Sequence, residues 1–191
     1  EVAKVCATLG VAHETLQWRN WDRQGNLQQE ARRARYGLLA DWAQAHDLDT
    51  VALGHTVDDQ AETVLMRLAR GAGSAGLAGM QPHSTRGGVN WVRPLLTKKR
   101  SDLRRYLTAG GIEWIDDPSN DDDNFDRIKM RRGLAHLHDL GISTWSLSQV
   151  AQNMTGVEEA LTVQTDAALI DHARVEAGAL VLPAGPFAHL P

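Results

Sequence analysis

Residues 50–62 read TVALGHTVDDQAE, and this stretch decides the fold of the chain. Residues 50–53 form a short apolar run of the kind that makes a buried strand. A helix is predicted directly after it, over residues 58–70. A strand that leads at once into a helix is the repeating unit of a parallel α/β sheet, and such sheets bind ligands outside the carboxyl ends of their strands. His55 and Asp59 therefore stand where chemistry is expected.

The rest of the sequence alternates between helices and strands in the same way. Helices are predicted over residues 2–9, 27–46, 101–109, 125–140 and 146–177, and strands over residues 12–18, 90–93, 112–115 and 179–183. We expect a parallel sheet with residues 50–53 as an inner strand, flanked by the helices 27–46 and 58–70. Ser101 is expected to cap its helix, and the glycine-rich residues 71–79 are expected to form a loop.

The composition is that of a globular protein. The 191 residues are 42% hydrophobic and 23% charged, with a formal net charge of -4. No apolar run approaches the roughly 18 residues of a membrane span, and the first residues do not look like a secretory signal. Cys6 is the only cysteine, which excludes an internal disulfide framework. We expect a cytoplasmic protein with one domain over residues 1–140, followed over residues 141–191 by a helical linker and the start of a second domain.

Positive charge is concentrated in the first of these domains. Residues 1–140 contain 19 of the 20 lysines and arginines, and 16 of the 20 are arginines. Three clusters hold most of them: Arg32, Arg33 and Arg35; Lys98, Lys99 and Arg100 with Arg104 and Arg105; and Arg127, Lys129, Arg131 and Arg132. A guanidinium suits phosphate because it can donate two parallel hydrogen bonds to it. A GC-rich genome that favours arginine codons would leave the same composition, so both interpretations stay open.

The polar residues that follow the strand also allow two interpretations. Thr56 with Asp59 three residues later fits a capping box at the start of the helix, and carboxylates in a first turn are favoured by the helix dipole. Capping explains these residues without catalysis. It does not explain why His55 stands at the strand end, where it can share a cleft with Asp59, so a catalytic role stays open beside the capping role.

Several segments resemble one known family. HTVDDQAETVL at residues 55–65, followed by RLARG at 67–71 and GLAGM at 76–80, is similar to the central motif of the tRNA(Ile)-lysidine synthases. Further matches follow in the family's order: ARY at residues 34–36 with Leu39, RPLL at 93–96, WIDDPSN at 114–120 and FDR at 125–127. The motifs cover about residues 1–135, and several ordered motifs of this length are a specific signal.

The resemblance implies a PP-loop ATP pyrophosphatase whose fold is a Rossmann-like doubly wound parallel sheet. It implies an ATP-dependent ligase that uses ATP and magnesium to adenylate the 2-carbonyl oxygen of the wobble cytidine in an isoleucine tRNA with a CAU anticodon. The ε-amine of free lysine then attacks that carbon and expels AMP, which leaves lysidine. The implied partners are tRNA and free lysine, without a membrane, and the resemblance allows for a homodimer.

Carried over residue by residue, the resemblance implies a catalytic set of His55, Asp59, Arg35 and Arg127. Arg35 and Arg127 would stabilise negative charge on the phosphates and on AMP, and Gly54 and Arg35 would contact the ATP. Asp59 would hold the lysine ammonium or magnesium, and His55 would move the proton of the attacking amine, although which of the two removes that proton stays open. Contacts to tRNA phosphates are expected from six cations: Arg70, Lys98, Lys99, Arg100, Arg131 and Arg132.

The sequence departs from the family in two places. The family begins with a strand and a Ser-Gly-Gly-x-Asp-Ser loop that cradles the ATP phosphates, and neither occurs here. We therefore expect a fragment that binds ATP weakly and is inactive by itself. Lys129 stands where the family has an arginine, so its role is open. Two alternatives remain: another PP-loop tRNA-modifying enzyme of the 2-thiocytidine type, for which Cys6 is a poor candidate thiol, and a non-catalytic RNA-binding fragment.

Overall fold

The computed structural model describes residues 2–19, 21, 24–114 and 126–187, but not the side chains of residues 126–128 and 186–187. The chain forms two compact units. The first comprises residues 1–53 and 83–92, and the second comprises residues 54–82 and 93–191.

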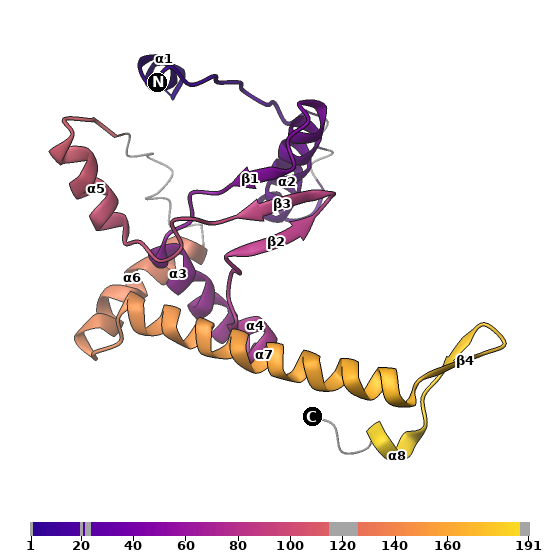
Figure 1. Cartoon of the computed structure of the whole chain (residues 1–191). Helices are drawn as coiled ribbons and strands as arrows, with labels where there is room; N and C mark the ends of the chain where they lie inside the picture. Colours follow the sequence, from indigo (N-terminus) through magenta and orange to yellow (C-terminus); the bar gives the residue numbers. More distant parts are fainter. Residues whose placement is uncertain (1, 20, 22–23, 115–125, 188–191) are drawn as a thin grey trace. The chain divides into compact units, whose positions relative to one another are not determined.

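The first unit is built on a three-stranded sheet that packs against one long helix. Its elements are α1 (Val2–Thr8), α2 (Leu27–Ala45), β1 (Thr50–Ala52), β2 (His83–Arg86) and β3 (Val89–Val92). The strand order is β1-β3-β2, with β1 parallel and β2 antiparallel to β3 (Figure 1). α2 packs on β1 and β3, and the core of the unit consists of Tyr36, Ala40, Ala43, Val89 and Trp91.

β3, and not β1, is the central strand of this sheet. Val89 and Trp91 on β3 are buried, whereas Thr50 and Ala52 on β1 are exposed. The prediction that residues 50–53 form an inner strand is therefore wrong for the described sheet. A run of four apolar residues does not show how many neighbours a strand has, because the same run suits a strand with one neighbour or with two.

β2 was not predicted, and it makes the sheet mixed instead of parallel. It is joined to β3 by Gly87 and Gly88, whose φ angles are +62° and +72°. Two successive residues with positive φ form the tight turn that joins antiparallel strands, and glycine adopts this conformation without strain. The Gly-Gly pair was the sequence signal for this hairpin.

Two further predicted strands do not form. Residues 12–18 lie outside regular secondary structure, and Glu14 instead accepts a hydrogen bond of 2.5 Å from the indole of Trp42. Residues 112–114 also lie outside strands, and residue 115 is not among the described residues. Alternation of polar and apolar side chains is not sufficient for a strand, because the backbone groups also need a neighbouring strand to pair with.

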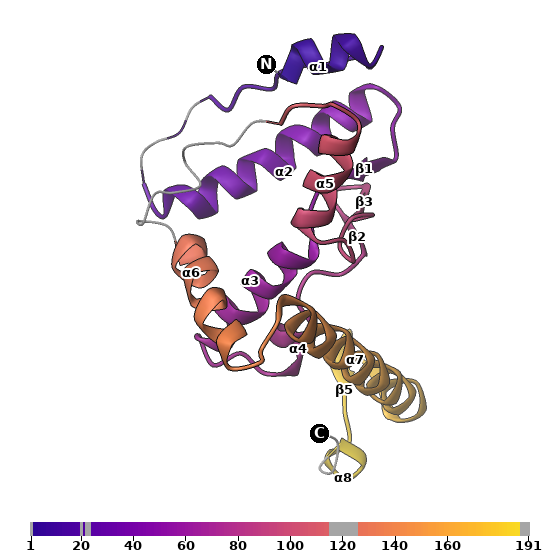
Figure 2. The same cartoon turned by 90° about the vertical axis from the view of Figure 1, so that its left-hand side faces the viewer.

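α3 is the centre of the second unit. The helices of this unit are α3 (Val57–Leu68), α4 (Ser74–Leu77), α5 (Arg100–Ala109), α6 (Asp126–Asp139), α7 (Thr144–His172) and α8 (Ala184–Phe187). α6 and α7 both pack against α3 (Figure 2), and the core consists of Ala61, Val64, Leu134, Leu147 and Ala151. The helices predicted over residues 58–70, 101–109 and 125–140 are confirmed to within two residues of their predicted ends.

α7 begins inside this core. Leu147 and Ala151, on its first half, are buried beside α3. The domain boundary expected at residue 140 therefore does not coincide with the division into compact units, and the two-domain organisation stays a prediction. No described helix is both long and apolar enough to cross a membrane.

The chain after α7 forms a hairpin that shortens the predicted helix. α7 was expected to continue to residue 177 but ends at His172, and β4 (Arg174–Glu176) pairs antiparallel with β5 (Ala179–Val181). The turn contains Ala177 and Gly178, which both have positive φ. The strand predicted over residues 179–183 is thus confirmed as the second strand of this hairpin.

The glycine-rich segment 71–79, predicted as a loop, contains the short helix α4. Two polar side chains of α3 hold this segment in place. The buried side chain of Gln60 donates to the carbonyl of Met80 at 3.0 Å and accepts from its N–H at 2.8 Å. Arg67 donates to the carbonyls of Gly76 and Gly79 at 2.6 and 3.0 Å. Gln60 and Arg67 are seven residues apart, about two helical turns, so they lie on one face of α3.

We expect Gly79→Ala to destabilise the chain by about 3 kcal/mol, because it combines left-handed strain with a collision. Gly79 has a φ of +67°, and an added Cβ would lie 2.7 Å from Nε2 of Gln60. Gly71→Ala is the matched control, since its φ is +69° but an added Cβ meets nothing within 4 Å, and it is expected to cost about 1 kcal/mol. Urea denaturation measures both. Equal losses would show that the contact with Gln60 is unimportant.

Candidate active site

The start of α3 is organised by a capping box between Thr56 and Asp59. The Thr56 hydroxyl accepts a hydrogen bond from the Asp59 N–H at 3.4 Å. In return, Oδ2 of Asp59 accepts from the Thr56 N–H at 2.8 Å and from the Thr56 hydroxyl at 2.7 Å. The capping interpretation of these residues is therefore confirmed, which leaves open whether Asp59 has a second role.

The first turn of α5 lies against the first turn of α3. Oδ2 of Asp58 accepts a hydrogen bond of 2.8 Å from the backbone N–H of Arg100, the first residue of α5. The Val57 N–H donates to the carbonyl of Lys98 at 3.0 Å. The cap residue of α5 is Lys99, which makes no side-chain cap, so the prediction that Ser101 caps this helix is wrong. Asp58 supplies the acceptor instead, from a helix that is distant in the sequence.

Arg100 also contacts the candidate catalytic carboxylate. Its Nη2 lies 3.2 Å from Oδ1 of Asp59, and the two side chains are 34% and 15% exposed. Both oxygens of Asp59 therefore have a hydrogen-bond donor from the protein. A carboxylate offers about four acceptor positions, and these contacts occupy three, so one position on Oδ1 remains for a further donor.

The surroundings of Asp59 keep it ionised. Burial acts to raise its pKa, but the hydrogen bonds from the side chain and backbone of Thr56, the positive charge of Arg100 and a smaller electrostatic effect of His55 outweigh it. The pKa of Asp59 consequently lies below its ordinary value of 3.8. An acid this strong is a poor proton acceptor at neutral pH. The arrangement favours Asp59 as an electrostatic anchor for a cation and leaves the proton transfer to His55.

Asp59 should make a pH-dependent contribution to stability. A carboxyl group whose pKa is lower in the folded state stabilises the fold above its unfolded pKa and loses this contribution as the pH falls through the folded pKa. We expect the stability difference between the native protein and Asp59→Asn to be constant near neutral pH and to shrink below about pH 4. Urea denaturation at a series of pH values from neutral to acidic measures it. A difference that did not change with pH would contradict the lowered pKa.

The other predicted site residues fall in several places. His55 and Gly54 directly precede the capping box, and His55 is half-buried while Gly54 is exposed. Arg35 lies on α2, in the first compact unit. Arg127 belongs to α6, but its side chain is outside the described part of the chain, as is the Asp-Pro-Ser-Asn segment 117–120.

The cations predicted to contact RNA divide into two groups. Four of them are exposed: Arg70, Lys98, Lys99 and Arg132. The other two, Arg100 and Arg131, form ion pairs with carboxylates of α3. Their predicted RNA contacts stay predictions, but each of these two side chains already has a partner within the protein.

The partner of Arg131 is the buried carboxylate of Glu62. Nε of Arg131 donates to Oε1 of Glu62 at 2.9 Å, and the Glu62 side chain is 1% exposed whereas that of Arg131 is 36% exposed. This pair connects α6 to α3. An ionised carboxylate at such a depth is costly without a partner, so Arg131 is needed for the packing of the two helices.

Sequence reasoning missed the structural importance of Glu62, Gln60 and Arg67. All three are polar residues on a helix that contributes Ala61 and Val64 to the core of the unit, and Gln60 and Glu62 are themselves buried. Polar residues are seldom buried without a hydrogen-bond partner, so their position within an apolar helical pattern was the available signal. The identity of the partners could not be obtained in that way.

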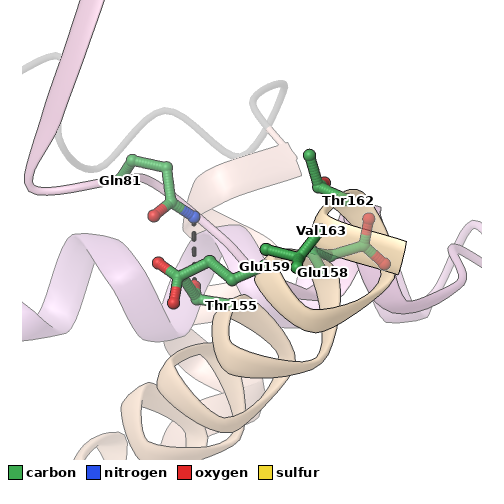
Figure 3. Close-up of a pocket in the computed structure, with 6 residues that line it drawn as sticks. All are labelled: Gln81, Thr155, Glu158, Glu159, Thr162 and Val163. Carbon is green, nitrogen blue, oxygen red and sulfur yellow. Dashed lines mark hydrogen bonds between the residues drawn. The ribbon is translucent and has the colours of Figure 1, made fainter. Parts of the chain in front are cut away.

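A shallow pocket lies elsewhere in the second unit, between residue 81 and the middle of α7 (Figure 3). Its volume is about 360 Å³, and it is lined by Gln81, Thr155, Glu158, Glu159, Thr162 and Val163. The side chain of Gln81 donates to the Thr155 hydroxyl at 3.1 Å. None of the predicted site residues lines this pocket, and its two glutamates would repel the phosphates of ATP, so we do not assign it to the nucleotide.

The sequence matches the PP-loop domain over residues 1–137, so the chain belongs to the PP-loop domain family. Two curated relatives are named tRNA(Ile)-lysidine synthase. The one from Ruegeria pomeroyi is 52% identical over 190 residues, and the one from Methylobacterium nodulans is 40% identical over 192 residues. Both alignments cover 100% of this chain, which spans 45% and 57% of the length of these relatives.

A solved structure supports the fold. The U34-tRNA thiolase from Methanococcus maripaludis, described with its [4Fe-4S] cluster, matches with a TM-score of 0.66 and 17% identity. The match covers 80% of this chain and 54% of that chain. The chain therefore has a PP-loop fold, built in its described part from helices and a small mixed sheet.

Proposed function

We propose that this chain forms part of the active site of a ligase that joins lysine to the wobble cytidine of an isoleucine tRNA with a CAU anticodon. ATP would activate the 2-carbonyl oxygen of the cytidine as an adenylate, with release of pyrophosphate. The lysine ε-amine would then displace AMP and leave lysidine. The two relatives named tRNA(Ile)-lysidine synthase support this proposal, and so does the motif around Asp59.

The observation that carries the proposal is the ionised carboxylate of Asp59. It lies just beyond β1, its pKa is lowered, and one acceptor position of Oδ1 remains for a donor. An ammonium group is a donor of the right charge. Asp59 would therefore bind the ε-ammonium of lysine, and His55 would accept the proton that must leave before the amine can attack.

Positive charge elsewhere in the chain would stabilise the negative charge of the leaving groups. Arg35 and Arg127 would stabilise the phosphates of ATP and the departing AMP, because a fixed cation costs no reorganisation when charge develops. Gly54 would allow close approach of the nucleotide, since nothing lies within 4 Å of the position that a side chain would occupy there. We also propose that the mixed sheet is part of a doubly wound, Rossmann-like sheet.

Magnesium would accompany the ATP, but the described residues do not fit a protein-bound ion. They contain no group of three histidine, cysteine or carboxylate side chains placed to bind a metal. Three of the four acceptor positions of Asp59 are occupied by Thr56 and Arg100. Asp59 is therefore assigned to the lysine ammonium and not to magnesium.

The test is lysidine formation by the full-length protein. Radiolabelled lysine, ATP and a transcript of the isoleucine tRNA would be incubated with the enzyme, with a transcript whose wobble cytidine is replaced by uridine as control. We expect lysine to enter the cytidine transcript alone, with one AMP released for each lysine joined. Mass analysis of the product nucleoside separates this activity from 2-thiocytidine formation, which would exchange one oxygen for sulfur. Absence of lysine from the product would overturn the proposal.

A further inference from the structure

Three arginine side chains of the first unit converge on the ring of Tyr36. The guanidinium carbons of Arg32 and Arg35, on α2, lie 5.2 and 5.9 Å from the ring centroid. The guanidinium carbon of Arg86, at the end of β2, lies 5.6 Å from the same centroid. The sequence clusters did not include Arg86, because it is 50 residues from Tyr36. We call the set of Arg32, Arg35 and Arg86 the Tyr36 arginine cluster.

The fold fixes the backbone on both sides of this cluster. Tyr36 is 7% exposed and packs on the ring of Trp91, with a centroid separation of 4.7 Å. The indole N–H of Trp91 donates to the carbonyl of Arg86 at 3.0 Å, and Gln44 of α2 donates to the carbonyl of Gly87 at 2.7 Å. The hairpin that carries Arg86 is therefore held against α2 before any ligand arrives.

Three like charges around one ring create a local positive field. Contact with an aromatic face partly offsets this repulsion, but it does not neutralise the charge. Among the described residues, no ion pair joins Arg35 or Arg86 to a carboxylate. Arg35 and Arg86 are both exposed, so an anion from solution can reach them.

We propose that Arg86 of the Tyr36 arginine cluster contacts a phosphate of the tRNA backbone, beside Arg35, which the proposed function assigns to the ATP phosphates. This inference rests on the proposed function for the identity of the RNA. Guanidinium groups bind phosphate oxygens in pairs of parallel hydrogen bonds. Arg86 is an exposed cation on a fixed hairpin, and such a cation suits a polyanion that lies across the surface.

The test compares Arg86→Ala with Arg33→Ala. Arg33 is the matched control, because it is an exposed arginine on α2 that does not contact the Tyr36 ring in the structure. Binding of labelled tRNA is measured at a series of salt concentrations. Each phosphate contact contributes about one unit to the slope of log K against log salt concentration. We expect Arg86→Ala to reduce the slope by about one unit and Arg33→Ala to leave it unchanged. Thermal unfolding of both variants checks the fold.

Two further measurements distinguish tRNA phosphate from ATP phosphate as the ligand of Arg86. Arg86→Lys keeps the charge but loses the planar fork, so it should retain the salt slope while binding tRNA more weakly. ATP binding is titrated in parallel, and we expect Arg86→Ala to leave it unchanged. Weaker ATP binding with an unchanged tRNA slope would assign Arg86 to the nucleotide and overturn the proposal.

Lysidine formation by the native protein separates this inference from the proposed function. If lysidine forms but Arg86→Ala keeps the native salt slope, the phosphate site is wrong and the proposed function stands. If no lysidine forms but the slope falls by about one unit, the site binds RNA phosphate and the proposed function is wrong.

Discussion

In the full-length enzyme, Asp59→Asn is expected to lower lysidine formation by about 10²–10³-fold, the effect of removing one fixed electrostatic contact from a reaction centre. The amide keeps the size of the side chain and an oxygen that can still accept the Thr56 N–H of the capping box. It loses the negative charge that would hold the lysine ammonium. The loss should appear in the KM for lysine as well as in kcat, because the ammonium is bound before the reaction.

His55→Ala is expected to lower kcat by about 10²–10⁴-fold, the usual contribution of a general base, with little change in the KM for lysine. Thr56→Ala is the control for both variants. It removes the capping hydroxyl at a cost of about 1 kcal/mol of stability but retains both proposed functional groups, so its rate should stay within a few-fold of the native enzyme. If Asp59→Asn and His55→Ala were as active as Thr56→Ala, capping would be the whole role of this segment.

The second large effect is expected for Arg131→Ala, which should destabilise the protein by about 3 kcal/mol. This is the lower end of the usual cost of leaving a buried charge unpaired. The lower end applies because the Arg131 side chain is 36% exposed, although its partner Glu62 is 1% exposed. Urea denaturation of the two proteins measures the difference.

Two variants isolate the ion pair. Lys129→Ala removes an exposed cation of the same helix and is expected to cost less than about 0.5 kcal/mol. In a Glu62→Gln background, where no buried negative charge remains, Arg131→Ala should cost only about 1 kcal/mol. An equal loss in both backgrounds would show that the two side chains are not coupled.

The same variant tests the predicted RNA contact of Arg131. A phosphate contact requires a shallower salt dependence of tRNA binding, by about one unit, with stability retained. The ion pair with Glu62 instead requires a loss of stability with an unchanged salt slope. The two roles of Arg131 are thus distinguished by measuring stability and the salt slope on one protein.

Local patterns in the sequence were sufficient for most of the helices and for part of the candidate site. The capping box of Thr56 and Asp59 and the helix that follows depend on residues three or four positions apart, and interactions of this range are visible in the sequence. For the same reason, the position of His55 at the carboxyl end of a strand could be predicted. The predicted helix ends differ from the observed ends where a glycine turn or a hairpin follows the helix, as after His172.

The partners of the charged residues were decided by the tertiary structure alone. Arg100 and Asp59 are 41 residues apart, and Arg131 and Glu62 are 69 residues apart. In the sequence these two arginines resemble the exposed cations beside them, because a guanidinium is the same group whether its partner is water, phosphate or a carboxylate. Which partner it has depends on which helices meet in the fold. α6 shares an apolar core with α3, whereas α5 has no buried residue and meets α3 through hydrogen bonds and an ion pair. The sequence by itself therefore determined where the candidate chemistry lies. The contacts of α3 with α5 and α6 decided which cations form ion pairs with the carboxylates of α3.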